Sequence, residues 1–228
     1  MSSTTEPACT PGDRKLEAVA DLIRRRFERP GSVLVVGCGD GTEAALLAEL
    51  LNTEVTGIDI SDAFHASAKK RVELLVADAR ELPFPDGSFD IVFSYHALEH
   101  VASPERAVAE MRRVLRPRGG FWIGTPNRSR LLGYLGSRDA TRREKIVWNV
   151  TDWRARLAGR FRNELGAHAG FTRGELRTML RSSFDVVNEE TSAYYALVYG
   201  RYRLAFAFLD RLGLARFVYP AIYFSGRS

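Results

Sequence analysis

The stretch that decides the fold is VLVVGCGDGT, Val33 to Thr42, in which four apolar residues lead into glycines at positions 37, 39 and 41. Glycine weakens regular elements, so this cluster indicates a turn that needs positive φ, close approach of something to the backbone, or both. The apolar run predicts a strand over Ser32–Val36, and Thr42–Leu51 predicts a helix with one apolar face. A turn between such elements exposes backbone N–H groups that suit an anion or a closely approaching ligand.

The same alternation of strands and helices continues along the chain. Further strands are predicted over Glu54–Asp59, Glu73–Ala77, Phe89–Ser94, Phe121–Thr125, Phe184–Asn188 and Ala221–Gly226. Helices are expected over Leu16–Phe27, after a Ser61 cap, from Ser103-Pro104 through Leu115, and behind a capping box at Thr172 and Glu175. We therefore expect a doubly wound α/β fold with a mostly parallel seven-stranded sheet and an antiparallel last strand.

Composition is that of an ordinary globular protein, with 45% hydrophobic and 27% charged residues in 228. We expect a disordered tail over residues 1–12 and one domain over 13–228, with helical insertions near 127–170 and 194–219. No signal peptide or membrane-spanning run is recognised. The two cysteines form neither a disulfide framework nor a metal site, so a cytoplasmic location is expected and no metal is.

The net charge of +5 is unevenly distributed along the sequence. Residues 127–228 carry 18 Lys/Arg and 9 Asp/Glu, whereas the first 126 carry 15 and 19. Such asymmetry is typical of a protein with an anionic partner, and equally of a solvated arginine-rich surface. Both interpretations stay open.

Two aspartates extend the argument from the glycine turn. The spacing G-x-G-x-G has Thr42 where a dinucleotide site would need its third glycine, which argues against NAD or FAD. Asp59 ends the second predicted strand, where a carboxylate can accept hydrogen bonds from ribose hydroxyls. Asp78 follows the third strand, where it can meet an adenine amine. Either aspartate alone is more readily a cap or turn residue, but the three features share one edge of the sheet.

At this point the chain resembles the class I S-adenosylmethionine-dependent methyltransferases, particularly the small-molecule type that includes quinone-biosynthesis enzymes. The matching stretches are VLVVGCGDGT, TGIDIS, LVADARELPFPDGSFDIVFSYHALEHV and EMRRVLRPRGGFWIGTPN. The resemblance implies a Rossmann-like methyltransferase fold with S-adenosylmethionine as cofactor. It places Gly37, Cys38 and Gly39 under the methionine part, Asp59 on the ribose, Ile60 against the adenine, Asp78 and Ala79 at the adenine edge, and Ser94 and Tyr95 near the methyl group. Val35 departs from the family pattern, which usually has an acidic residue there.

Methyl transfer from a sulfonium mainly requires alignment and exclusion of water. A neutral nitrogen acceptor needs no base, whereas a hydroxyl does better with one, and histidine is the natural choice. The candidates are His168, in GAHAGFT, and His100, which shares the i, i+4 spacing of one helical face with His96. Each also has a purely structural interpretation, and His65 is given no role.

The resemblance implies that the insertions near 127–170 and 194–219 form the lid and acceptor site, because members of the family vary there. We expect methyl transfer to a small-molecule acceptor, with oxygen favoured, in secondary-metabolite, glycan or lipid modification. Aromatic residues either line an apolar acceptor pocket or pack the insertion's own helices: Tyr194, Tyr195, Tyr199, Tyr202, Phe206 and Phe208. Arginines 201, 203, 211 and 216 among them permit contact with a membrane surface or lipid. The alternatives are an RNA methyltransferase and a non-catalytic protein that retains the fold. No RNA-binding module is recognised, so nucleic acid is not an expected partner. The sequence does not fix the acceptor or the oligomeric state.

Overall fold

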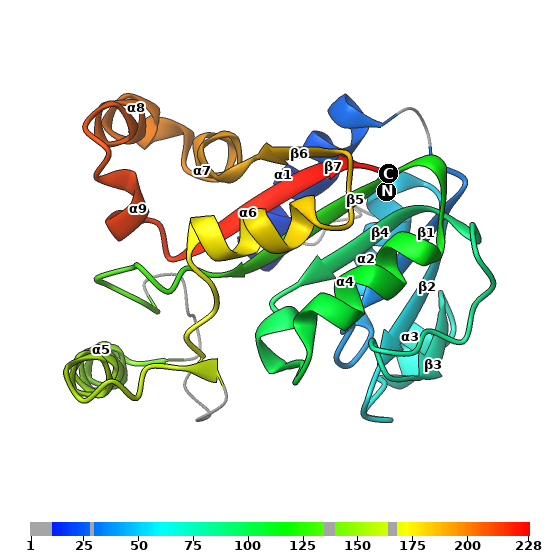
Figure 1. Cartoon of the computed structure of the whole chain (residues 1–228), viewed down its shortest axis with the longest axis horizontal. Coiled ribbons are helices and arrows are strands. Elements are labelled where there is room, and N and C mark those ends of the chain that lie inside the picture. Colours follow the sequence, from blue (N-terminus) through cyan, green and yellow to red (C-terminus); the bar gives the residue numbers. More distant parts are fainter. Residues whose placement is uncertain (1–10, 28–29, 135–139, 164–167) are drawn as a thin grey trace, which may run out of the picture.

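A seven-stranded sheet forms the centre of the computed structural model, which describes residues 11–27, 30–134, 140–163 and 168–228. The strand order is β3-β2-β1-β4-β5-β7-β6; pairs among β1 to β5 are parallel, and β7 is antiparallel to β5 and β6 (Figure 1). The strands are β1 Ser32–Val36, β2 Glu54–Asp59, β3 Glu73–Val76, β4 Phe89–Tyr95, β5 Leu115–Pro126, β6 Val186–Glu189 and β7 Ala221–Arg227. The expected doubly wound, mostly parallel sheet is confirmed.

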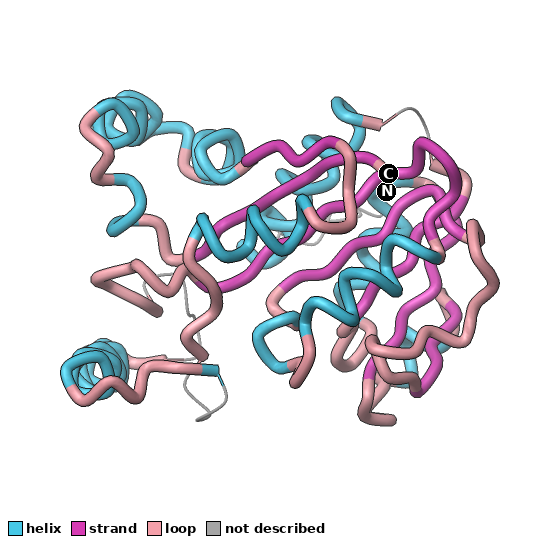
Figure 2. Tube along the Cα trace, viewed as in Figure 1, coloured by secondary structure: helices cyan, strands magenta, loops and turns pink. Residues whose placement is uncertain are grey.

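Helices cover both faces of the sheet, as βαβ crossovers require (Figure 2). One face carries α1 Pro11–Arg26, α2 Thr42–Leu51, α3 Ala66–Lys69 and α7 Thr191–Val198. The other carries α4 Pro104–Arg113 and α6 Arg173–Arg181. The apolar stripe of α4, with Val108 and Met111 fully buried, shows why this segment forms a helix against the sheet.

Five further helices are described outside these two layers. They are η1 Leu98–His100, α5 Arg142–Leu157, η3 Gly200–Tyr202, α8 Arg203–Arg211 and α9 Ala215–Val218. Figure 1 shows α5 and the α8–α9 pair together at the end of the molecule opposite β3. Neither α5 nor α8 buries a residue. None of the described helices is long and apolar enough to span a bilayer.

Several predicted boundaries are wrong: α1 begins at Pro11, inside the expected disordered tail, and β6 begins at Val186 and not at Phe184. Helix α3 begins only after an N-cap at His65, whose Nδ1 accepts the Ser67 N–H, because Ser61 instead donates its own N–H to Asp59 at the end of β2. Helix α4 ends at Arg113 and β5 already begins at Leu115. Residues 116–119 bulge from β5, since Leu115 pairs with Phe89 and Gly120 with Ile91. Most of the expected N-terminal tail, residues 1–10, lies outside the described residues.

Candidate active site

The three glycines after β1 all have positive φ, at 76° for Gly37, 55° for Gly39 and 81° for Gly41. A Cβ on Gly37 would lie 2.2 Å from the Ala97 Cβ, and one on Gly41 would lie 2.5 Å from the Leu74 side chain. A Cβ on Gly39 would meet no described atom within 4 Å. Packing therefore requires glycine at position 37, and at position 41 the Leu74 methyl groups would have to move, whereas Gly39 opens its backbone to space that a ligand can approach.

That space belongs to a cavity of about 460 Å³ at the carboxyl ends of β1, β2, β3 and β4. The chain leaves β1 and β4 in opposite directions across the sheet, which makes this the switch point where ligands bind in doubly wound folds. The cavity brings together most of the residues predicted for the cofactor: Gly37, Gly39, Asp59, Ile60, Asp78, Ala79 and Ser94. His100 also lines it.

Asp59 is fixed by the backbone around it. Its Oδ2 accepts the Gly39 N–H at 2.8 Å and its Oδ1 accepts the Ser61 N–H at 3.0 Å. Each carboxylate oxygen has a further lone pair with which to accept from a hydroxyl. The carboxylate therefore ties the glycine turn to the end of β2 and still presents acceptors to the cavity.

Asp78 lies next to a guanidinium that also lines the cavity. Arg80 contacts it with Nη2 at 2.6 Å and donates its backbone N–H to Oδ1 at 2.8 Å. Hydrogen bonds from the Arg80 side chain and then from its backbone lower the pKa of Asp78 to about 2. The carboxylate is thus an ionised acceptor at neutral pH, and an adenine amine would share it with Arg80.

Two of the predicted cofactor residues lie outside the lining of this cavity. The Cys38 side chain is buried beside Gly57, and its backbone N–H donates to Ile58 O at 2.9 Å. Burial, and then the charge of Asp59, raise the pKa of the Cys38 thiol to about 12, so it is not a thiolate at neutral pH. Tyr95 follows Ser94 on β4 and faces a second cavity instead.

The residues present fit an adenosyl sulfonium ligand. The Ser94 Oγ is fully buried, lines the cavity and has no hydrogen-bond partner among the described residues, so a polar group of a ligand can satisfy it. Ile60 is 72% exposed at the rim of the same cavity, where an apolar side chain can cover a purine face. With the carboxylate at β2 and the open backbone at Gly39, these groups match the parts of a nucleoside.

The second cavity has a volume of about 670 Å³ and is dominated by tyrosine. All eight tyrosines of the chain line it: Tyr95, Tyr134, Tyr194, Tyr195, Tyr199, Tyr202, Tyr219 and Tyr223. Several rings also contact one another, as Tyr194 and Tyr223 do with centroids 4.0 Å apart. The tyrosines therefore both line the cavity and pack against each other. Phe206 lines the cavity, whereas Phe208, named with it from the sequence, does not and is 62% exposed.

The two cavities meet at His96 and His100, which line both. His168 comes from a distant segment and places its ring 4.8 Å from that of His100, centroid to centroid. The structure thus brings the two predicted base candidates into contact. Their placement does not come from a helical face shared by His96 and His100, because only Leu98–His100 is helical and His96 has φ of 54°.

A buried glutamate, not named from the sequence, completes this junction. The Glu99 side chain is 2% exposed, and its Oε1 lies 3.6 Å from Nδ1 of His96. Its Oε2 has no hydrogen-bond partner among the described residues, and Glu99 lines the tyrosine cavity. The described residues contain no group of three or more His, Cys, Asp or Glu side chains that could hold a metal ion. In the sequence only the spacing from His96 distinguishes Glu99, because burial leaves no mark on a single acidic residue.

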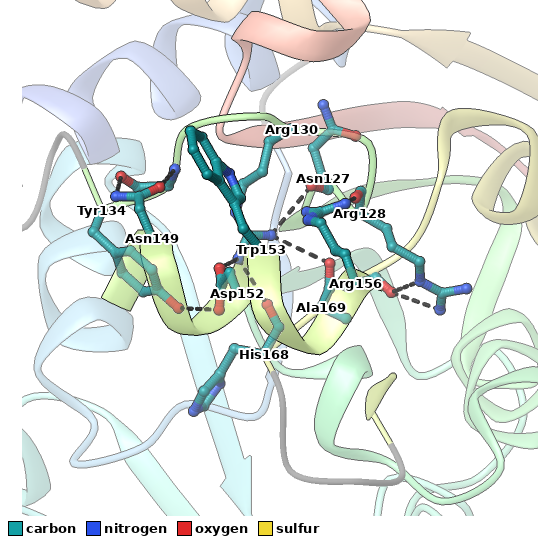
Figure 3. Close-up of polar contacts among 12 residues, drawn as sticks. Asn127, Arg128, Arg130, Tyr134, Asn149, Asp152, Trp153, Arg156, His168 and Ala169 are labelled. Atoms are coloured by element: carbon teal, nitrogen blue, oxygen red, sulfur yellow. Dashed lines mark hydrogen bonds and ion pairs between the residues drawn. The ribbon is translucent and has the colours of Figure 1, made fainter. Parts of the chain in front are cut away.

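A second cluster missed from the sequence surrounds Arg130 (Figure 3). Its buried guanidinium donates to the backbone carbonyls of His168 at 3.1 Å and Ala169 at 3.3 Å, and contacts Asp152 of α5 at 3.2 Å. Figure 3 shows the His168 imidazole pointing away from this cluster. Arg130 therefore fixes the backbone of His168 while leaving its ring directed elsewhere.

Comparison with known proteins places this site in a wider group. Residues 34–123 match a family described as "Methyltransferase domain". A phosphatidylethanolamine N-methyltransferase of Cereibacter sphaeroides is 35% identical over 67% of this chain and 73% of its own length. The 27-O-demethylrifamycin SV methyltransferase of Amycolatopsis mediterranei (strain S699) is 36% identical over 54% of this chain. The match spans 47% of the length of this last relative, and 39% and 38% of the length of two further curated relatives.

Solved structures show the same architecture. The crystal structure of an S-adenosylmethionine-dependent methyltransferase from Mesorhizobium loti superposes with a TM-score of 0.58 at 24% identity, covering 92% of this chain and 98% of the other. At this identity the likeness establishes the fold alone.

Proposed function

The chain belongs to the class I S-adenosylmethionine-dependent methyltransferases, and from this membership we propose that it methylates a hydroxyl oxygen of a small apolar acceptor. The observation that carries the proposal is the meeting of two different cavities at His96 and His100. One has the donor and acceptor groups for a nucleoside, and the other is aromatic. A reaction between two bound molecules requires such a junction.

The first cavity is the proposed cofactor site. Asp59 would hold the ribose, Asp78 and Ala79 the adenine edge, and Ile60 the adenine face. Gly37 and Gly39, the backbone of Cys38, and Ser94 would bind the methionine part. When bound, S-adenosylmethionine supplies an electrophilic methyl group on a charged sulfur. The chain's own contribution is to hold the ligand where the two cavities meet and to exclude water there.

The tyrosine cavity is the proposed acceptor site. Burial raises the pKa of Tyr95 and of Tyr219 to about 12, and also raises that of Tyr194, Tyr195 and Tyr223. These five side chains therefore remain neutral phenols at neutral pH. They offer aromatic surface and hydrogen bonds to an apolar or aromatic acceptor, but they do not supply a base.

A base for the acceptor hydroxyl then comes from the histidines. His100 and His168 are in contact at the junction, and His96 is beside the buried carboxylate of Glu99. We propose that one of these imidazoles accepts the hydroxyl proton, with Glu99 stabilising the charge that forms on His96 if His96 does so. Left-handed φ at His96 adds support, because strained non-glycine residues concentrate at functional sites.

A nitrogen acceptor is the second candidate. The relative of which this chain covers 73% is named for N-methylation of a phosphatidylethanolamine. A neutral amine would need no base, so the histidines would have only a positioning role. The two candidates make different predictions for the histidine variants below.

Cofactor binding and methyl transfer test the proposal together. We expect calorimetry to show S-adenosylhomocysteine binding to the full chain, and Asp59→Asn to weaken it at least about tenfold, since a carboxylate that accepts ribose hydrogen bonds is worth about 1.4 kcal/mol or more. Transfer of labelled methyl groups from S-adenosylmethionine is then measured on apolar phenols, fatty alcohols and fatty amines. Ser61→Ala is the matched control, because it keeps the backbone N–H that Asp59 accepts. Absence of ligand binding by the wild-type chain would support a non-catalytic protein instead.

The base assignment is tested with the best acceptor of that panel. Histidine general-base catalysis contributes about 10² to 10⁴ in rate, so His96→Asn, His100→Asn or His168→Asn should lower kcat by about that factor with little change in KM for the cofactor. Glu99→Gln should lower kcat less if His96 is the base. Full activity in all three histidine variants removes base catalysis and favours the amine acceptor.

A further inference from the structure

Exposed apolar side chains gather on the helices around the tyrosine cavity. Among the described residues, 18 large apolar side chains are exposed; eight of them lie between residues 131 and 157 and seven between 197 and 218. Monomeric proteins rarely expose such a concentration without a binding partner. We call the exposed faces of residues 142–157 and 201–218 the rim surface.

Helix α5 contributes a stripe along one side. Its exposed apolar residues include Ile146, Val150, Trp153 and Leu157, at i, i+4, i+7 and i+11, with Leu157 90% exposed. This spacing places the four side chains along one face of the helix. The helix buries no residue, so the stripe is accessible to solvent, although the Trp153 indole N–H also donates to Leu131 O at 2.7 Å.

Helix α8 repeats this arrangement. Leu204, Phe208 and Leu212 occur at i, i+4 and i+8 and are 80%, 62% and 53% exposed. The intervening Phe206 turns toward the tyrosine cavity. The outer stripe is therefore not the side of α8 that packs on the rest of the chain.

The 201–218 part of the rim surface borders the acceptor cavity, and the 142–157 part is joined to it through the segment before α5. Tyr202 and Val218 are both exposed and line that cavity, so they stand at its mouth. The Leu131 N–H donates to Phe217 O at 2.8 Å and joins the segment before α5 to α9. Figure 1 shows α5 and α8–α9 at the same end of the molecule.

The charges on the rim surface are positive and largely uncompensated. Seven of its arginines are exposed and form no ion pair with a described residue: Arg142, Arg143, Arg154, Arg201, Arg203, Arg211 and Arg216. Elsewhere on the described surface some exposed arginines are paired, as Arg71 is with Glu49 and Arg116 with Asp90, and others, such as Arg118 and Arg181, are not; the rim surface differs in that its unpaired arginines lie beside exposed apolar stripes. Apolar stripes flanked by unpaired arginines are complementary to an anionic lipid interface.

We propose that the rim surface docks on a bilayer that contains anionic phospholipids, so that an amphiphilic acceptor enters the tyrosine cavity from the membrane. Trp153 and Phe208 would lie at the level of the headgroups, where aromatic side chains are favoured. The arginines would contact lipid phosphates. Docking itself does not depend on the proposed reaction, so its test is separate from the tests of catalysis.

Vesicle binding tests the proposal on the full chain. The protein is sedimented with vesicles of phosphatidylcholine alone or mixed with phosphatidylglycerol. We expect binding to the mixed vesicles, weakened by salt, and a loss of at least about tenfold in the double variant Leu204→Ser/Phe208→Ser. The double variant Arg203→Glu/Arg211→Glu should also lose binding. Val76→Ser, an exposed apolar position at the opposite end of the molecule, is the matched control and should bind as the wild type does.

Folding and self-association are checked on the same samples. The circular dichroism spectrum and the unfolding midpoint of each variant should match those of the wild type, because the changed side chains are exposed. The proposal is overturned if the wild-type chain binds neither kind of vesicle, or if Leu204→Ser/Phe208→Ser binds as well as the wild type. Sedimentation velocity gives a further outcome that overturns it: the wild-type chain is a dimer and Leu204→Ser/Phe208→Ser alone is a monomer. The rim surface would then bind a second copy of the chain.

Discussion

Gly37 and Gly39 have the same backbone handedness but different surroundings. At Gly37 the neighbouring Ala97 leaves no room for a side chain, whereas at Gly39 the space is open. A side chain at either position is strained by the positive φ. Only at Gly37 does a packing conflict add to that strain.

We therefore expect two different outcomes from the same substitution. Gly37→Ala should lower the free energy of unfolding by about 3 kcal/mol or more, from backbone strain plus overpacking. Gly39→Ala should lower it by about 1 kcal/mol, yet weaken S-adenosylhomocysteine binding at least about tenfold, because its Cβ would project into the cofactor cavity. Urea unfolding and calorimetry measure the two effects. Equal losses of stability in both variants would contradict this distinction.

Among single residues, the sequence predicted those that lie at the ends of strands. That Asp59 and Asp78 line one cavity could be predicted, because the carboxyl ends of parallel strands share one edge of the sheet. Glu99 could not, because its importance lies in burial without a partner, which depends on the packing of η1. The conclusion that Cys38 lines the ligand site applies at most to its backbone, since its side chain turns into the core.

Helix α5 shows what holds an element that has no core of its own. It buries no residue, and polar contacts attach it to the segment before it. Asp152 contacts Arg130, Asn149 accepts the Gly133 N–H at 2.7 Å, and the Trp153 indole donates to Leu131 O at 2.7 Å. Such an element opens at a lower free energy than the sheet does.

The Arg130–Asp152 pair should control that opening. Asp152→Asn leaves the buried Arg130 charge without its carboxylate, which costs about 3 kcal/mol when such a pair is fully buried. Hydrogen exchange of the α5 amides should therefore become faster, while the amides of β1 and β4 stay protected. Arg154→Gln on the same helix is the control, since Arg154 is exposed and forms no ion pair with a described residue. If the α5 amides exchange at the same rate in the wild type and in Asp152→Asn, the Arg130–Asp152 pair does not hold α5 in place.

The sequence also contained an unused signal for α5. Thr141 and Glu144 form the same reciprocal capping box as Thr172 and Glu175, and only the second was predicted. The periodicity of α5 is weak because no stripe of it faces the core, so the usual pattern of a packed helix is absent. Helices α4 and α6 pack on the sheet, so each has an apolar face whose helical spacing is visible in the sequence, and both were predicted.

Across the whole molecule, the fold could be predicted further than the site. Every strand of the sheet was expected, because each contains a short apolar run between turns or helices, whether it lies in the parallel centre or at the edges. The folding of residues 191–218 into helices that carry one wall of a cavity depends on contacts between distant segments. The sequence shows the tyrosines but not that all eight converge on one cavity.

Because the tyrosines are buried around one cavity, the stability of the folded chain should depend on pH in the alkaline range. The pKa of Tyr95 in the folded chain is raised above its ordinary value of 10.0 to about 12, chiefly by burial, and that of Tyr219 is raised likewise. A raised pKa stabilises the folded state fully below pH 10, and this stabilisation is lost as pH rises toward 12. We expect the free energy of unfolding to fall in this range, and less steeply in Tyr95→Phe. Titration of all tyrosines near pH 10 in the folded chain, followed by absorbance, would contradict the prediction.

The tyrosine cavity also has an optical consequence. Tyr223 lies 6.3 Å from the buried indole of Trp122, and Tyr134 lies 5.1 Å from Trp148, centroid to centroid, so light absorbed by the phenols can reach tryptophan by energy transfer. A molecule that fills the cavity changes the polarity around every phenol of the chain at once. Unlabelled compound libraries can therefore be screened by intrinsic fluorescence before any reaction product is known.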